Sequence, residues 1–184
     1  MFRTDPRDAD GCPSGEGEPA AEATIRAAEP TDVKALSIVL GAEEYFADRL
    51  ARQAEGLGVL FTAWWADRPV GDLYLWLEDA EEPPIRSRLP GVPLLTHLEV
   101  LPAARNRGVG RALVRVAEGR LASLGHRRAA LAVRTDNADA ARLYRRLDYR
   151  DWGHGTVVCY AEHFLPDGRT VSEAELCHVL VKTL

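Results

Sequence analysis

The spacing of apolar residues along the chain predicts where strands and helices lie. Apolar residues alternate or run together briefly in segments typical of strands, and recur at helical spacing in segments typical of helices. The expected strands cover residues 24–28, 59–65, 70–77, 94–101, 129–133, 156–163 and 176–184. The expected helices cover residues 33–40, 43–55, 107–124 and 138–147. The pattern therefore predicts an α/β domain of the mixed α+β kind, with helices flanking a sheet.

The strand over residues 94–101 leads directly into the longest expected helix. Its alternation places two sets of residues on opposite faces: Thr96, Leu98 and Val100 on one, and His97, Glu99 and Leu101 on the other. The helix is followed by the strand over 129–133, so the two strands are expected to be parallel.

The connection over residues 78–93 is expected to be a loop longer than a usual hairpin loop, and loops of this kind are commonly functional or mobile. It begins with a group of acidic residues: Glu78, Asp79, Glu81 and Glu82. These carboxylates are either a solvated loop or a collar around an acceptor site that favours cationic substrates. The sequence leaves both interpretations open.

Composition limits the number of domains and the cellular setting. Residues 1–22 contain little that could be buried and are expected to be disordered, whereas residues 23–184 suffice for one domain. No apolar segment approaches the ~20 residues of a membrane helix, and the N-terminus lacks an apolar leader. The three cysteines, Cys12, Cys159 and Cys177, show no disulfide or metal spacing. We therefore expect a cytoplasmic protein with no membrane partner.

The net charge of −5 argues against nucleic acid as the main partner, yet one region is strongly basic. Arginines crowd around Gly108 and Gly110, at the start of the helix over 107–124. Glycine lets the backbone approach a ligand closely, and first-turn N–H groups have no intrahelical acceptor. Together with the helix dipole, these features indicate a site for a pyrophosphate.

Two other phosphate-binding motifs fit this loop poorly. The dinucleotide-binding pattern G-x-G-x-x-G/A would need a third small residue where Leu113 stands, and too little chain follows to build a doubly wound sheet. A P-loop would need the sequence Gly-Lys-Ser/Thr, which is missing.

Residues 95–149 resemble the GNAT superfamily of acyl-CoA-dependent N-acyltransferases. Arg105, Gly108 and Gly110 fill the pattern R/Q-x-x-G-x-G/A, and Asn137, Ala140 and Tyr144 fill N-x-x-A-x-x-x-Y. The resemblance implies a GNAT-type single domain with a central mixed, mostly antiparallel sheet flanked by helices. It also implies a parallel strand-helix-strand unit that binds acetyl-CoA.

The resemblance further implies roles for individual residues. Those expected to bind acetyl-CoA are Val100, Leu101, Arg105, Asn106, Arg107, Gly108, Val109, Gly110, Arg111, Asn137 and Tyr144. The N–H groups near Val100 and Leu101 would meet the pantetheine and the thioester oxygen if the strand bulges there. Tyr144 would be the general acid that protonates the thiolate, and its alternative is a core aromatic residue.

The base that accepts the amine proton is not marked by a motif. Glu99, His97 and Glu78 are candidates, of which Glu99 is preferred, and a water relay is the alternative. No metal is expected, because the other histidines show no ligand spacing: His126, His154, His163 and His178.

The sequence thus predicts an acetyl-CoA-dependent N-acetyltransferase that acts on a primary amine of a small molecule or of a peptide or protein. The alternative is a non-catalytic module that binds acyl-CoA as a sensor or scaffold. Only the enzyme would release free thiol when offered an amine. The sequence leaves open the acceptor, the acyl-chain preference and whether the protein forms a homodimer.

Overall fold

The computed structural model describes residues 22–164 and 169–184. The strands are β1 (Thr24–Ala27), β2 (Gly58–Trp65), β3 (Arg68–Trp76), β4 (Leu94–Val100), β5 (Arg128–Arg134), β6 (Arg150–Phe164) and β7 (Thr170–Thr183). The helices are α1 (Val33–Leu40), α2 (Glu43–Ala54), α3 (Pro83–Arg88), α4 (Val109–Ser123) and α5 (Ala138–Arg146). Short 3-10 turns at Pro30–Asp32 and Pro102–Ala104 precede α1 and α4.

The strands form one sheet in the order β1-β2-β3-β4-β5-β7-β6. Neighbouring strands are antiparallel except for β4 and β5, which are parallel and joined by α4. The prediction of a mixed, mostly antiparallel sheet with a parallel strand-helix-strand unit is therefore confirmed.

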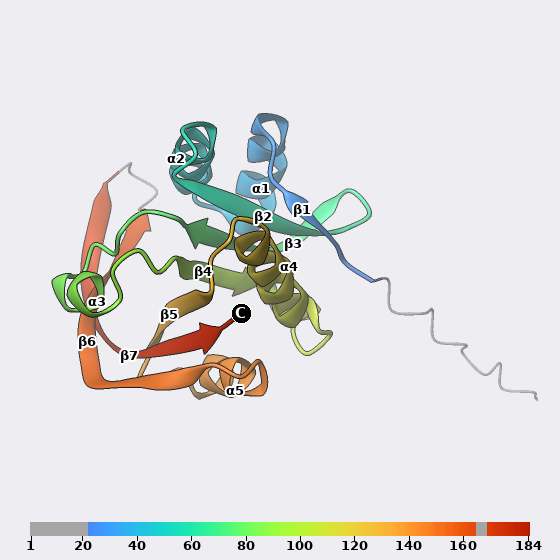
Figure 1. Ribbon diagram of the computed structural model, residues 1–184. Helices are drawn as coiled ribbons and strands as arrows, with labels where there is room; N and C mark the ends of the chain where they lie inside the picture. The colour runs from blue at the N-terminus through green and yellow to red at the C-terminus, as the bar shows by residue number, and fades with distance from the viewer. Residues whose placement is uncertain (1–21, 165–168) are drawn as a thin grey trace, which may run out of the picture.

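Two hydrophobic cores cover the two faces of the sheet, because successive side chains of a strand point to opposite faces. In β3, Tyr74 and Trp76 pack in the core that contains buried residues of α1 and α2. Leu73 and Leu75 pack in the core formed with α4 and α5. Figure 1 shows α1 and α2 together beside β2 and β3, with α4 and α5 elsewhere on the sheet.

The sequence had suggested a loop between β3 and β4. The structure instead places the short helix α3 within this connection. Pro83 and Pro84 occupy the first turn of α3, where a missing N–H costs no hydrogen bond. Ile85 is buried and attaches this short helix to the core. One buried apolar residue is too weak a periodic signal to predict a helix.

The prediction was also wrong about where β6 and β7 begin. β6 begins at Arg150 and β7 at Thr170, each six residues earlier than expected. Gly153 and Gly155 take left-handed φ angles of 79° and 78°, and the pairing of β6 with β7 shifts register between Asp151 and Thr156. This bulged segment has no apolar alternation, so it lacked the pattern of a strand. The predicted disordered segment, residues 1–22, lies outside the described residues except for Glu22.

Candidate active site

The glycine loop ends at the N-terminus of α4 in a left-handed backbone. Asn106 and Gly108 have φ angles of 59° and 83°, and Gly108 is the N-cap residue. No side chain caps the helix, so the first-turn N–H groups of Val109, Gly110 and Arg111 lack a capping acceptor. These donors and the positive end of the helix dipole form an environment suited to an anion.

Two arginines of the loop make contacts that hold its shape. The Nε of Arg105 donates a hydrogen bond to the carbonyl oxygen of Val100 over 2.9 Å, which ties the loop to the end of β4. The guanidinium of Arg107 lies over the ring of Trp65, 5.1 Å from its centroid. The side chain of Arg111, in the first turn of α4, is exposed. The basic character of the loop is thus fixed in place by neighbouring elements.

Strands β4 and β5 separate immediately after they meet. Their ladder pairs Leu94 with Ala130, whose N–H donates to the carbonyl oxygen of Pro93 over 3.0 Å. Beyond that point β5 pairs with β7 as far as Arg134, and β4 runs on beside β3 alone (Figure 1). The far half of β4 therefore offers a free backbone edge toward β5.

The two strand-end donors expected from the sequence differ in this structure. The N–H of Leu101 donates to the carbonyl oxygen of Val70 over 2.9 Å, so it is already used within the sheet. Val100 lies opposite Gly71 in the adjoining non-hydrogen-bonded pair, so its N–H points away from β3. Of the two expected donors, Val100 alone faces the side on which β4 and β5 have separated.

The second motif element packs against the first. A Cβ built on Gly110 would lie 3.5 Å from the side chain of Leu143 in α5 and 3.7 Å from that of Val100. Gly110 thus faces protein, and a Cβ there would make ordinary van der Waals contacts with α5 and β4. Asn137 caps α5, where its side chain accepts a hydrogen bond from the N–H of Ala140 over 3.1 Å.

Tyr144 lies on the buried side of α5 with only 7% of its surface exposed. Its ring contacts that of Tyr149 edge to face, with centroids 5.8 Å apart. Burial raises the pKa of Tyr144 above its usual value, which keeps the hydroxyl protonated and also makes it a weaker acid. The residue is at once a core aromatic and a protonated hydroxyl, so its two sequence interpretations are compatible.

Strand β4 bulges, but earlier than expected. Asp72 pairs with Glu99 and Tyr74 with Thr96, so β4 has one more residue than β3 between these pairs. His97 occupies the bulge with a left-handed φ of 49°. Leu95 consequently packs in the same core as Leu98, and the predicted uninterrupted alternation, with Thr96 on the face of Leu98, is wrong.

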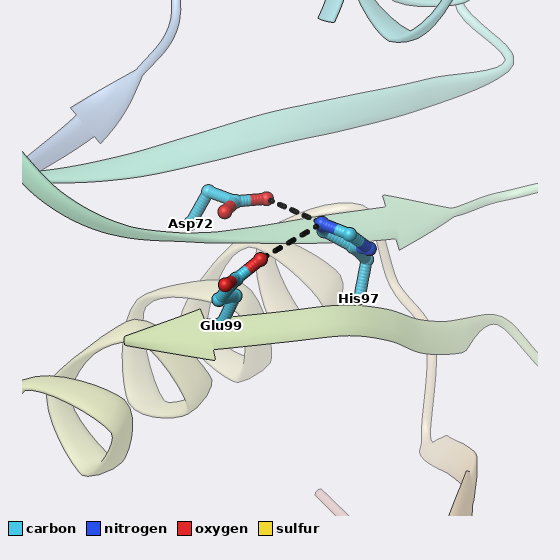
Figure 2. A group of neighbouring side chains, drawn as sticks. All are labelled: Asp72, His97 and Glu99. Atoms are coloured by element: carbon cyan, nitrogen blue, oxygen red, sulfur yellow. Dashed lines mark ion pairs between the residues drawn. The ribbon is translucent and has the colours of Figure 1, made fainter. Parts of the chain in front are cut away.

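The bulge brings three titratable side chains together (Figure 2). Nε2 of His97 lies 3.8 Å from Oδ2 of Asp72 and 3.6 Å from Oε2 of Glu99. Asp72 comes from β3, and the other two residues come from β4. We call these residues, Asp72, His97 and Glu99, the bulge cluster. Two of them were candidate bases in the sequence; Asp72 was not.

Asp72 is the buried member of the bulge cluster. It is 0% exposed, and neither carboxylate oxygen makes a hydrogen bond with any described residue. Burial raises the pKa of Asp72 well above its usual value, and the charge of Glu99 raises it further, while the hydroxyl of Tyr45 opposes the shift. A buried carboxyl without a hydrogen bond is costly, so this one calls for an explanation.

His97 is neutral at physiological pH. Burial lowers the pKa of His97 to about 4, and the positive charge of Arg49 acts in the same direction. The side chain keeps 40% of its surface exposed, so water moderates the shift. The imidazole ring packs against the ring of Tyr45, with centroids 4.0 Å apart and the ring planes tilted by 34°.

Arg49 lies among the aromatic residues on this side of the sheet. Its guanidinium is 5.2 Å from the ring centroid of Tyr45, 5.0 Å from that of Tyr74 and 5.4 Å from that of Trp76. Arg49 also pairs with Asp48 over 3.2 Å. Helix α2 therefore supplies both an aromatic ring and a cation close to the bulge cluster.

The acidic connection is partly neutralised by its own surroundings. Glu78 forms an ion pair with Arg52 of α2. Oδ1 of Asp79 accepts a hydrogen bond from the N–H of Gly91 over 3.1 Å, which closes the connection. These two carboxylates hold the connection in shape. Glu78 is thereby taken up in an ion pair, which weakens its case as a base.

Sequence reasoning missed Asp72, Tyr45 and Arg49. A signal for Asp72 was present, because it lies two positions before Tyr74 in an otherwise apolar strand and so shares the buried aromatic face. Tyr45 and Arg49 are one turn apart on α2. Their approach to β4 depends on how α2 packs on the sheet, which no local pattern reveals.

Comparison with known proteins gives the family of the chain. The sequence profile of the acetyltransferase (GNAT) family matches residues 27–149. The chain belongs to this family, whose members are acetyltransferases that use acetyl-CoA. No curated protein matches the chain in sequence. Within the described parts of the chain, no helix is long and apolar enough to cross a membrane.

Solved structures share the fold at low sequence identity. An acetyltransferase of the GNAT family from Streptococcus pneumoniae superposes with a TM-score of 0.65 at 20% identity, covering 89% of this chain and 100% of that one. A phosphinothricin acetyltransferase from Sinorhizobium meliloti, solved in complex with AcCoA, gives 0.64 at 18% identity and 89% coverage of both chains. The ribosomal-protein-S18-alanine N-acetyltransferase from Escherichia coli gives 0.61 at 20% identity, covering 88% of this chain and 93% of that one.

Proposed function

We propose that the protein transfers the acetyl group of acetyl-CoA to a primary amine by direct attack of the amine on the thioester. The observation that carries this proposal is the separation of β4 and β5 next to the uncapped N-terminus of α4. A pyrophosphate at the N-terminus of α4 would leave the rest of the donor to run along the free edge of β4. Membership of the family and a neighbour solved with AcCoA support the same donor.

The donor would be held chiefly by main-chain groups. The N–H groups of Val109, Gly110 and Arg111 bind the pyrophosphate, and Arg105, Asn106, Arg107 and Gly108 shape the loop around it. The N–H of Val100 meets the pantetheine. Asn137 orients the first turn of α5 and thereby Tyr144. Leu101 contributes through packing, because its N–H is bonded to Val70.

The chemical step needs a proton acceptor on the amine side and a proton donor on the sulfur side. The amine nitrogen bonds to the carbonyl carbon, the carbon–sulfur bond breaks, and the electron pair of that bond stays on sulfur. Glu99, with His97 beside it, takes the proton lost by the amine, and Tyr144 gives its proton to the thiolate. The products are the acetylated amine and free CoA.

The acceptor is proposed only as a class, a primary amine of a small molecule or of a peptide. Two of the neighbours named above are named for chemically different acceptors, and all are 20% identical or less, so no substrate is carried over. The bulge cluster and the aromatic residues around Arg49 form the proposed acceptor side.

The proposal is tested by measuring thiol release from acetyl-CoA against a panel of amines and peptides, with mass spectrometry of the acceptor. We expect release that requires both protein and amine and that matches acetylated product. Binding of acetyl-CoA by calorimetry without release for any acceptor would favour a sensor or scaffold instead.

A further inference from the structure

The bulge cluster combines two features that are expensive to maintain. A buried carboxyl group without a hydrogen bond loses the stabilisation that water gives it in the unfolded chain. A left-handed backbone at a residue other than glycine, as at His97, is unfavourable as well. Strain of this kind persists where the surrounding structure enforces it, and it gathers at ligand sites. The cluster therefore has the properties of a site that becomes satisfied when a ligand binds.

We propose that Asp72, His97 and Glu99 form a binding site for a divalent transition-metal ion of the zinc type. One ligand atom from each residue lies within 4.8 Å of the others. The side chains converge from two adjacent strands on one point, with the His97 nitrogen between the two carboxylates (Figure 2).

The two ligand spacings that involve His97 are close to those of a metal site, and the two carboxylate oxygens lie within 4.8 Å of each other. Ligands at ~2.0–2.1 Å from a tetrahedral zinc ion lie ~3.3–3.4 Å apart. The two distances from Nε2 of His97, 3.8 Å and 3.6 Å, exceed this by a few tenths of an ångström. Small rotations of the partly exposed His97 and Glu99 side chains would close the difference, while Asp72 is fixed by burial.

The set of ligand atoms, one imidazole nitrogen and two carboxylate oxygens, favours some cations over others. Imidazole suits zinc, copper, nickel and iron, whereas magnesium and calcium prefer oxygen ligands alone. One imidazole and two carboxylates leave a fourth position open toward the exposed side of the cluster. A metal ion would also give the buried Asp72 a counter-charge, which is how proteins ordinarily retain buried carboxylates. The charge of Arg49, paired with Asp48, is the main opposing influence.

Metal binding is measured directly on the untagged, chelator-treated protein by calorimetric titration with ZnCl₂, in the absence of acetyl-CoA and amine. We expect one zinc ion per chain, with Mg²⁺ binding at least ~10-fold more weakly. Glu99→Gln and His97→Asn should each weaken zinc binding by at least ~10-fold, since even outer-shell partners of a metal are worth about that much. Asparagine tolerates the left-handed backbone at His97, so this variant should fold.

The matched control is His178→Asn, the same substitution at an exposed histidine of β7. It should bind zinc as the wild type does. The proposal is overturned if the wild type shows no stoichiometric zinc binding, if both cluster variants bind as tightly as the wild type, or if Mg²⁺ binds equally well. Loss of binding in His178→Asn would place the ion elsewhere and also overturn it.

One consequence rests on the proposed function. Because Glu99 and His97 would also receive the amine, zinc should inhibit acetyl transfer competitively with the acceptor and not with acetyl-CoA. The calorimetric result does not depend on turnover, so failure to detect acetyl transfer would refute the proposed function without touching the metal site. Inhibition competitive with acetyl-CoA would contradict the placement of zinc on the acceptor side.

Discussion

The two sides of the proposed active site use different kinds of polar group, main-chain groups on one side and side chains on the other. On the donor side, the polar groups are main-chain N–H groups at the start of α4 and at Val100. On the acceptor side, they are the side chains of the bulge cluster, with Arg49 nearby. A main-chain site needs glycines at fixed spacing and leaves a motif, whereas a side-chain site assembled from several elements leaves none.

The difference also appears in burial and strain. The donor side places its left-handed backbone on Gly108 and Asn106, two residue types that adopt this conformation at little cost. The acceptor side places a left-handed backbone on His97 and an unbonded carboxyl on Asp72. Evolution of a common donor site and of a substrate-specific acceptor site would produce this contrast, because only the second must recognise a particular molecule.

The largest expected effect is at Tyr144, the donor-side residue whose side chain is proposed to act as the general acid. Tyr144→Phe should lower kcat by about 10²–10⁴-fold with little change in acetyl-CoA affinity, because a transition-state proton is lost and packing is kept. Tyr149→Phe is the matched control, since Tyr149 is buried beside Tyr144 and has no proposed role. Steady-state kinetics and calorimetry measure both. Equal kcat values for the two variants would leave Tyr144 a core residue.

The next effect concerns stability on the acceptor side. The raised pKa of Asp72 means that the folded state holds a proton that the unfolded state loses, so stability falls as pH rises above the usual pKa of Asp, near 4. Asp72→Asn removes this titration, so the variant should be more stable than the wild type at pH 8, because its amide stays neutral at every pH. The gain over wild type should shrink toward pH 4, where the carboxyl is protonated in both states.

Thermal unfolding of wild type and Asp72→Asn across this pH range measures the effect. A variant whose Tm is lower than that of the wild type at every pH would show that the carboxylate is stabilised by a partner. His97 has the opposite effect on the pH dependence of stability. Its pKa of about 4 in the folded state lies below the usual value of 6.5, so the unfolded state binds this proton more readily. The free energy of unfolding should therefore fall as pH falls from 6.5 toward 4, and His97→Asn should flatten this part of the curve of Tm against pH.

A smaller effect is expected from glycine substitutions on the donor side. They compare a glycine that is needed for its left-handed backbone with glycines whose positions have room for a side chain. Gly108→Ala should cost about 1–2 kcal/mol, because alanine strains in the left-handed region, and should weaken acetyl-CoA binding by ~5–30-fold. Gly119→Ala, in the interior of the same helix and free of contacts at its Cβ position, should leave binding unchanged. Gly110→Ala should also be tolerated, since its Cβ would make ordinary contacts.

Calorimetric titration of acetyl-CoA into the three glycine variants provides the measurement. Wild-type affinity for acetyl-CoA in a folded Gly108→Ala variant would show that the left-handed turn is not needed for binding. A large loss in Gly110→Ala would mean that the donor itself approaches Gly110, as the sequence had suggested.

The smallest effect is expected at the acidic connection. Glu78→Gln should change the free energy of unfolding by no more than ~0–1 kcal/mol, because a partly exposed ion pair with Arg52 contributes little. The KM of a cationic acceptor should change by a correspondingly small factor. Arg52→Gln should have an effect of similar size. Measurement of KM at low and high salt tests this, and a rise of more than ~10-fold in Glu78→Gln would restore the connection as a collar for cationic substrates.

The sequence by itself determined the elements whose cause is local. Apolar spacing located β1, α1, α2 and the β2–β3 hairpin, and Asn137 marked the start of α5. Gly108 marked the N-terminus of α4, because helix ends and left-handed turns depend on a few adjacent residues. The fold class followed from the order of these elements, and the donor loop from its glycine spacing.

The tertiary structure decided what depends on pairing between distant strands. The extra residue of β4 exists only relative to β3, so the bulge at His97, the reversal of Thr96 and the meeting with Asp72 could not be read along one strand. The choice between the Val100 and Leu101 donors depended on the register with Val70 in the same way. Side-chain direction alternates residue by residue, so a one-residue change in register exchanges buried and exposed positions, and only the assembled sheet fixes that register.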